Sequence, residues 1–284
     1  PAILLVPYIG ATLDFLGVTL YNLMGRPLGR GFIRFLVPVS PPAATRRNML
    51  VFAFANQKGG VGKTTSAVTL ADGLARLIKR CLLVDLDPQG HLALSFGLDK
   101  SPGLYRLVCL DERLESVVQT VRPNLDLVSG DKQTEMVKRQ ITLSDFRETI
   151  LRDILADSDY DVALLDMAPS LDVLHLNGLI AADWVVIPTR MDALSVDGVK
   201  EILATMAEIS RSGHRYRGYS ILPTFFDRTT LETMIQFEQV TKVFGENVWP
   251  PIPQDTRVRE TSAYGQTLWE YSPGSSSVEG FVDG

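Results

Sequence analysis

The chain has 284 residues, 45% of them hydrophobic and 21% charged, which is typical of a globular protein with one large domain or two small ones. Its net charge of −5 does not favour nucleic acid, so DNA binding would need a local basic patch. Two cysteines exclude a disulfide framework, and no Cys/His cluster has zinc spacing. Cys81 and Cys109 lie in apolar runs, which favours buried free thiols over a metal or iron–sulfur site that would need further ligands.

Residues 1–48 differ in composition from the rest of the chain. Residues 2–24 are largely apolar with Asp14 as the only charge, and arginines and prolines follow. The segment fits a membrane span, an apolar arm packed on the body or on a partner, or sequence foreign to the native protein. We favour the third, because the chain starts with Pro1 and Met49 stands just before the first predicted strand. The segment also lacks the cationic start and the cleavage site of a signal peptide.

The most distinctive stretch of the chain is NQKGGVGKTT at residues 56–65. An apolar run at residues 50–55 precedes it, and a helical pattern follows at residues 67–78. Strand, glycine loop and helix form the context of a phosphate-binding loop, because glycines let backbone N–H groups converge on a phosphate at the helix N-terminus. Lys63 can reach the β- and γ-phosphates, and the Thr64 hydroxyl can bind Mg²⁺. A glycine-rich turn with two solvated lysines is the weaker interpretation.

Two further apolar runs end in carboxylates. The run at residues 81–84 leads to Asp85 and Asp87, and the run at residues 162–165 leads to Asp166. Runs that are apolar on both faces suit parallel strands covered by helices, and the carboxyl ends of such strands are where α/β sheets bind ligands. Acids at these places also form turns, but their position downstream of the glycine loop favours a site. Asp166 matches a Walker B carboxylate, which holds Mg²⁺ through water.

The remaining elements alternate between strands and helices. The sequence predicts short strands at residues 125–128, 184–189 and 219–224, and it predicts helices at residues 143–156, 199–209 and 230–244. This alternation predicts one α/β domain with a mostly parallel central sheet. Residues 272–284, with Pro273, Gly274 and three serines, are predicted to form a flexible tail.

The densest basic cluster lies at residues 211–217 and contains Arg211, Arg215 and Arg217. One interpretation is a solvated helix end, where basic side chains interact favourably with the helix dipole. The other is a patch that contacts a nucleic-acid phosphate backbone. The residues themselves favour neither, and His214 belongs to the same exposed loop.

Four blocks of the chain resemble the ParA/Soj-type partition ATPases of the ParA/MinD superfamily. They are residues 56–65 with the deviant Walker pattern K-G-G-x-G-K-[ST], residues 84–90, residues 165–170, and residues 252–260 with the following Tyr264-Gly265-Gln266. The resemblance covers residues 49–271 and implies that they form one domain with a three-layer P-loop NTPase fold, in which helices flank a mostly parallel central sheet. The last block is the loosest, because the family usually has Arg-Asn where this chain has Gln254-Asp255. His91 also stands where the family commonly has Asn.

The resemblance implies a set of residues around Mg²⁺-ATP. ATP would contact Lys58, Gly59, Gly60, Val61, Gly62, Lys63, Thr64 and Thr65. Pro253 and Asp255 would contact the adenine. Thr64 and Asp166 would hold Mg²⁺ with support from Asp85, and Asp87 would orient the attacking water.

The resemblance also implies the partners. ATP would join two subunits face to face, with Lys58 reaching the phosphates of the partner subunit and Lys63 acting within its own subunit. The homodimer would bind DNA without sequence preference, and Arg211, Arg215, Arg217 and Lys242 are placed by position in the plausible region. A ParB-like centromere-binding protein would stimulate hydrolysis and so move a plasmid or a chromosome. The implied location is the cytoplasm, on the nucleoid.

Three alternatives carry less weight. A MinD-like ATPase that toggles on a membrane has a basic amphipathic C-terminal helix, whereas residues 275–284 contain no basic residue, so a membrane role would depend on residues 1–48 being native. A ParA-like protein that positions a non-DNA cargo would have the same ATPase sequence. A nitrogenase-reductase-like protein needs paired cluster cysteines at a subunit interface, whereas Cys81 lies inside a predicted strand.

Overall fold

The computed structural model describes residues 49–77, 80–145, 147–193 and 195–282. Segment 1–48, for which the sequence permits three interpretations, lies outside the described residues. Within the described part of the chain, no helix combines the length and the apolar character that a membrane span requires.

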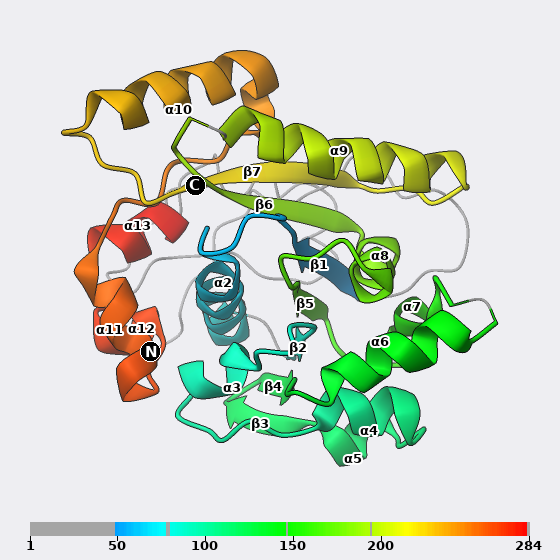
Figure 1. The fold of residues 1–284 in the computed structure, drawn as a ribbon. Helices are drawn as coiled ribbons and strands as arrows, with labels where there is room; N and C mark the ends of the chain where they lie inside the picture. The colour runs from blue at the N-terminus through cyan, green and yellow to red at the C-terminus, as the bar shows by residue number, and fades with distance from the viewer. Residues whose placement is uncertain (1–48, 78–79, 146, 194, 283–284) are drawn as a thin grey trace.

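One seven-stranded sheet organises the structure (Figure 1). Its strands are β1 (Leu50–Phe54), β2 (Cys81–Asp85), β3 (Gln119–Arg122), β4 (Leu125–Val128), β5 (Val162–Asp166), β6 (Trp184–Arg190) and β7 (Gly218–Thr224). Their order is β3-β4-β2-β5-β1-β6-β7, and all neighbours pair in parallel except β3 and β4. The predicted mostly parallel sheet is therefore confirmed. The carboxyl ends of its parallel strands meet at one edge, here called the carboxyl edge, and the opposite edge is the amino edge.

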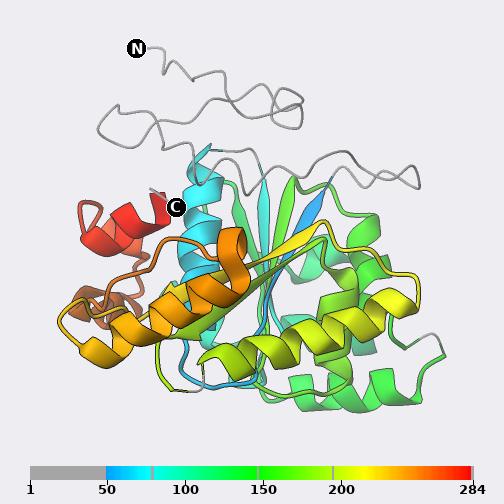
Figure 2. The ribbon, with the colours of Figure 1, turned by 90° about the horizontal axis from the view of Figure 1, so that it is seen from above.

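Helices cover both faces of the sheet. One face carries α2 (Lys63–Leu77), α3 (His91–Ser95), α11 (Thr256–Tyr264), α12 (Leu268–Tyr271) and α13 (Ser276–Val282). The other carries α4 (Gly103–Cys109), α5 (Leu114–Val117), α6 (Thr134–Leu143), α7 (Ile150–Ala156), α8 (Val173–Ala181), α9 (Ser195–Arg211) and α10 (Leu231–Phe244). Figure 2 shows α9 and α10 side by side, and the short 3-10 helix η1 (Gly245–Asn247) follows α10.

Alternating side chains of the central strands divide the core into two clusters. In β1, Val51 and Ala53 pack under α4–α10, whereas Phe52 and Phe54 pack under α2 and its neighbours. Burying one large apolar side chain stabilises the fold by roughly 1.5–3 kcal/mol. Because both faces are covered, the central strands are continuous apolar runs, and this is why they are readily predicted from the sequence.

Two elements differ from the prediction. The helix predicted at residues 143–156 begins only at Ile150, as α7. A separate helix, α6, precedes it and ends at Leu143, where the predicted helix was expected to begin. Leu143, which suggested the start of a buried face, is 86% exposed at the end of α6. The antiparallel edge strand β3 is half-exposed and carries little apolar signal, so the sequence pattern did not reveal it.

The structure corrects the predicted flexible tail at residues 272–284. Residues 276–282 form α13, and its side chains Val278 and Phe281 are buried in the cluster under α2. The Ser277 hydroxyl lies 3.4 Å from the Pro253 carbonyl and 3.3 Å from the Asp255 carboxylate, to which it donates. Two apolar residues three positions apart are enough to attach this short helix to the domain.

Candidate nucleotide-binding site

The loop between β1 and α2 curls at the carboxyl edge, as the glycine pattern predicts. Gly60 (φ 69°) and Gly62 (φ 91°) have the left-handed backbone that favours glycine. The buried Asn56 side chain closes the loop, since its Oδ1 accepts a hydrogen bond from the Lys58 N–H at 2.9 Å and its Nδ2 donates to the Pro188 carbonyl at 2.9 Å. Asn56 therefore ties the loop to β6, a role that the loop pattern alone does not reveal.

The other predicted loop residues line the same turn. Gly59 is exposed at its tip, Val61 is buried, and Thr64 and Thr65 are half-buried in the first turn of α2. The α2 N-terminus thus lies directly behind the loop, where its free N–H groups attract an anion.

Lys63 lies inside the loop. Its side chain is almost fully buried, and its ammonium donates to the carbonyls of Asn56 at 2.9 Å and Lys58 at 3.0 Å. Burial lowers the pKa of Lys63, while the negative charges of Asp166 and Asp87 oppose that change. A phosphate held by the loop would satisfy this cation better than neutral carbonyls do, because hydrogen bonds between charged groups are stronger.

Lys58 contacts its own subunit. Its ammonium pairs with the carboxylate of Asp192, which follows β6 at the carboxyl edge, and the two side chains are 45% and 29% exposed. Such exposed pairs contribute at most about 1 kcal/mol. Asp192 is not among the predicted site residues. It is nevertheless an acid just beyond a buried parallel strand, and the same feature identified Asp85 and Asp166.

Asp85 and Asp166 are register partners on neighbouring strands, and both are buried. The oxygens of Asp85 accept backbone N–H groups of Asp87 at 3.0 Å and Leu92 at 3.2 Å. Burial raises the pKa of Asp85 well above its ordinary value, and the nearby Asp166 carboxylate adds to this. Asp85 thus holds the turn that carries Asp87, and its support of the metal shell stays a prediction.

Asp166 has the features of a magnesium-binding carboxylate. Its Oδ1 is buried without a hydrogen-bond partner among the described residues, and the Thr64 hydroxyl hydrogen-bonds to its carboxylate. Burial raises the pKa of Asp166, and Thr64 and Lys63 partly oppose this rise. No group of three His, Cys, Asp or Glu side chains in the described residues suits a metal ion. Mg²⁺ does not need such a group of three side chains, since it usually takes one or two protein oxygens together with phosphates and waters. Thr64 and Asp166 therefore fit this ion.

We expect Asp166→Asn to stabilise the metal-free protein at pH 7.5. A carboxyl group whose pKa is raised in the folded state stabilises the fold at low pH, and this contribution is lost as the pH rises through the folded-state pKa. Removing the charge should raise Tm at pH 7.5 by a few degrees, since about 1 kcal/mol shifts Tm by about 2–4 °C for a domain of this size. Thermal unfolding in EDTA between pH 5 and 8 measures this. Asp197→Asn, at an exposed carboxylate on α9, is the matched control, and a lower Tm for Asp166→Asn would contradict the assignment.

Asp87 is half-buried at the carboxyl edge, close enough to Lys63 and Asp166 to affect their pKa values. Its Oδ1 accepts the Gln89 N–H at 2.9 Å. Gly130 packs against this turn, because a Cβ at Gly130 would lie 2.9 Å from the Asp85 carbonyl oxygen and 3.0 Å from that of Asp87. The predicted acid is thus held at the site by a close backbone approach.

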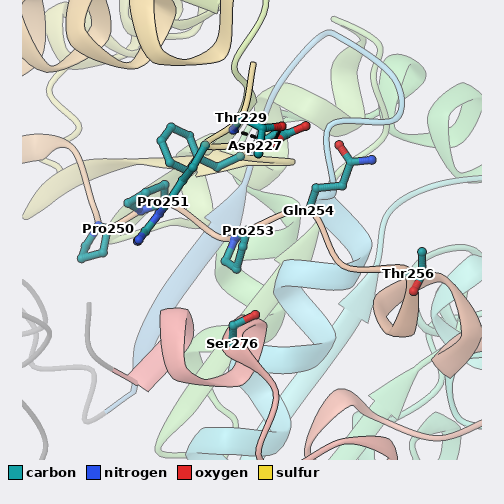
Figure 3. A pocket seen from close by; sticks show the side chains of 10 residues that line it. Asp227, Thr229, Pro250, Pro251, Pro253, Gln254, Thr256 and Ser276 are labelled. Atoms are coloured by element: carbon teal, nitrogen blue, oxygen red, sulfur yellow. Dashed lines mark hydrogen bonds between the residues drawn. The ribbon is translucent and has the colours of Figure 1, made fainter. Parts of the chain in front are cut away.

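The two predicted adenine contacts separate in the structure. Pro253 lines an open hollow of about 770 Å³, whereas Asp255 caps α11, accepting the Arg257 N–H at 3.0 Å and pairing with the Arg257 guanidinium. Figure 3 shows Gln254 on the side of this hollow nearest the ribbon that leads into α2. The hollow is lined by Phe226, Asp227, Arg228, Thr229, Pro250, Pro251, Pro253, Gln254, Thr256 and Ser276. Gln254, not Asp255, faces the hollow from this segment.

The predicted DNA-contacting residues lie away from the loop. Arg211 ends α9 and Arg215 follows it, both exposed near the amino edge where β7 begins (Figure 1). Arg217 is half-buried, and its guanidinium lies 3.6 Å from the Asp183 carboxylate. Lys242 is exposed in the last turn of α10. Arg211, Arg215 and Lys242 therefore present positive charge to solvent, and Arg217 is partly neutralised.

Comparisons with known proteins agree with this geometry. A family model described as an AAA domain matches residues 49–216. The chromosome-partitioning ATPase Soj of Thermus thermophilus is 40% identical over 232 residues, covering 81% of this chain and 91% of that protein. The chromosome partitioning protein ParA of Caulobacter vibrioides is 32% identical over 231 residues, covering 78% of this chain and 86% of its own length.

A solved structure shares the fold. Cobyrinic acid a,c-diamide synthase from Mycobacterium smegmatis, solved with a bound ATP analog and magnesium, is 30% identical with a TM-score of 0.67. The match covers 76% of this chain and 93% of that one. The fold is that of P-loop NTPases, as the sequence predicts. With its loop, carboxylates and relatives in agreement, the chain belongs to the ParA/Soj family of chromosome-partitioning ATPases in the ParA/MinD superfamily.

Proposed function

We propose that the chain hydrolyses ATP in a Mg²⁺-dependent cycle, that its ATP-bound form is a homodimer, and that this dimer binds DNA without sequence preference. A ParB-like partner stimulates hydrolysis, so that a plasmid or chromosome is moved by a cytoplasmic, nucleoid-associated protein. The observation that carries the proposal is the buried Lys63 ammonium inside the loop, beside Thr64 and the unpartnered Asp166 oxygen. A solvated glycine turn would bury neither charge.

Each residue has a distinct part in the proposed reaction. Mg²⁺, when bound with ATP, neutralises phosphate charge, and Thr64 and Asp166 would hold it. Lys63 stabilises the β- and γ-phosphates within its own subunit, and the backbone N–H groups of the loop share that task. Asp87 orients the attacking water, because it is the half-buried carboxylate on the turn held by Asp85. In the segment 253–256, Gln254 and Pro253 would make the main contacts with the adenine of ATP.

Lys58 would cross to the partner subunit. The exposed pair with Asp192 contributes at most about 1 kcal/mol, so it is readily exchanged. A cation supplied in trans to the transferring phosphoryl group accelerates hydrolysis by about 10³–10⁵-fold, which corresponds to roughly 4–7 kcal/mol. That figure describes stabilisation of the transition state, and the weak pair with Asp192 would cost little to break when ATP joins two subunits.

Binding to a random-sequence DNA duplex tests the proposal. We expect binding with ATP and little with ADP or without nucleotide, weakening steeply between about 50 and 200 mM salt. Arg211→Ala/Arg215→Ala removes four charges from a dimer, so the slope of log K against log salt should fall by up to roughly 4. Arg113→Ala, on an 86% exposed side chain, controls for general charge loss.

The same titration identifies the outcome that would contradict the DNA proposal. An active ATPase that binds DNA in no nucleotide state would exclude the DNA-bound cycle. Liposome binding under the same three conditions would then test the membrane alternative.

A further inference from the structure

An unusual backbone conformation follows β7. Phe225 has φ 52°, in the left-handed region, and the two other non-glycine residues with positive φ in the described part of the chain are Asp111 and Asn124. Asp and Asn tolerate this region because their short polar side chains hydrogen-bond locally, whereas a bulky aromatic residue is strained there. Strain of this kind persists only where the surrounding structure imposes it, and it concentrates at functional sites.

The structure pins the backbone on both sides of Phe225. Thr224 ends β7 in register with Arg190 of β6. On the other side, the Phe226 N–H donates to the Ile252 carbonyl at 3.0 Å, and Phe226 pairs with Pro253 in an isolated bridge. Phe225 therefore has no freedom to relax by moving its neighbours.

Thr224 contacts the phosphate-binding loop, and the Phe225 ring lies beside it. The Thr224 hydroxyl donates to the Val61 carbonyl at 2.8 Å in a buried hydrogen bond. A Cβ built on Gly62 would lie 3.6 Å from the Thr224 methyl and 3.8 Å from Cε2 of the Phe225 ring. Gly62 is itself left-handed, so two left-handed residues from distant segments lie close together here. Val61 and Gly62, beside which Thr224 and Phe225 lie, directly precede Lys63.

A cation lies over the same ring. The Arg190 guanidinium carbon is 5.2 Å from the centroid of Phe225, within the range of a cation–π interaction, and Arg190 is exposed at the end of β6. Arg190 thus lies over the ring, and the ring edge lies beside the space that a side chain at Gly62 would occupy.

We infer that Thr224 and Phe225 brace the phosphate-binding loop from β7, and that the Phe225 ring, held by Arg190, is a positioning residue for bound ATP. The inference rests on the proposed nucleotide binding and adds to it a residue outside the loop. Backbone N–H groups bind phosphate well only when their directions are fixed, so a loop that can shift at Val61 and Gly62 should bind it less tightly.

Two substitutions at Phe225 distinguish the effect of the aromatic ring from the effect of the backbone strain. Phe225→Ala and Phe225→Gly both remove the ring, but only glycine accepts φ 52° without strain, so the Gly variant should have the higher Tm of the two. Both should bind a non-hydrolysable ATP analogue about tenfold more weakly than the wild type, and Phe225→Tyr should restore affinity. Equilibrium titration and thermal unfolding of the full chain measure the two quantities.

The control and the contradicting results are distinct. Phe244→Ala, at a half-buried phenylalanine that ends α10, should lower Tm and leave affinity unchanged. The inference is overturned if either Phe225 variant binds the analogue like the wild type, or if the Gly variant regains the affinity that the Ala variant loses. A wild-type chain that binds no analogue would instead overturn the proposed function.

Discussion

Lys58→Ala is expected to abolish ATP-driven dimerisation while nucleotide binding is largely retained. Lys63 and the loop N–H groups make the contacts within the subunit, whereas the Lys58 ammonium is exposed at the carboxyl edge and held there by Asp192. Loss of a cation supplied in trans removes about 10³–10⁵-fold in turnover. Size-exclusion chromatography with a non-hydrolysable ATP analogue, together with steady-state phosphate release, measures both effects.

Asp192→Asn is the matched control for this substitution. It removes the partner of Lys58 within the subunit and leaves the lysine in place, so the variant should dimerise at least as well as the wild type. If Lys58→Ala forms a normal ATP-dependent dimer, the assignment in trans is wrong. If Asp192→Asn loses the dimer to the same extent, the pair acts within the subunit instead.

Asp87→Ala should bind ATP and dimerise but release phosphate about 10²–10⁴-fold more slowly, the range typical of losing a group that handles the attacking water. The Asp87 carboxylate is half-buried, and its main-chain turn is held by Asp85 and packed against Gly130. Removing the side chain beyond Cβ breaks its hydrogen bond with the Gln89 N–H but keeps the main-chain hydrogen bond to Asp85 and the packing against Gly130. The ATP dimer should therefore be trapped, with a lifetime longer by a similar factor.

Gln89→Ala controls for this effect, since Gln89 is exposed on the same turn. It should hydrolyse ATP at the wild-type rate. Unchanged phosphate release from Asp87→Ala would remove Asp87 from the mechanism, and loss of ATP binding would show that the substitution acts on the loop rather than on the water.

The parts of the site that the sequence predicts are local in the chain. The glycines, Lys63 and Thr64 fall within ten residues, and Asp85 and Asp166 each end an apolar run. Both features can be recognised in the sequence. Phosphate binding needs consecutive N–H groups, and a strand covered on both faces must be apolar up to its end.

The parts that the sequence does not predict depend on distant contacts. Asn56 contacts Pro188, Lys58 contacts Asp192, and Thr224 contacts Val61 because of the order of strands β1, β6 and β7. No periodicity encodes which strand lies beside which. The same applies to the Asp85 side chain, whose two hydrogen bonds with backbone N–H groups are not predicted by the apolar run before it.

The strand order also divides the site by its resistance to local unfolding. Thr64 follows β1, and Asp85 and Asp166 end β2 and β5, which are all interior strands with partners on both sides. Asp192, which pairs with Lys58, follows the interior strand β6, whereas Thr224 ends the edge strand β7 and Phe225 follows it. Interior strands open only with the whole domain, whereas edges fray at lower free energy. The part of the site that would hold the metal is thus built on interior strands, whereas Thr224 and Phe225, which brace the loop, lie at the edge strand, where local unfolding costs least.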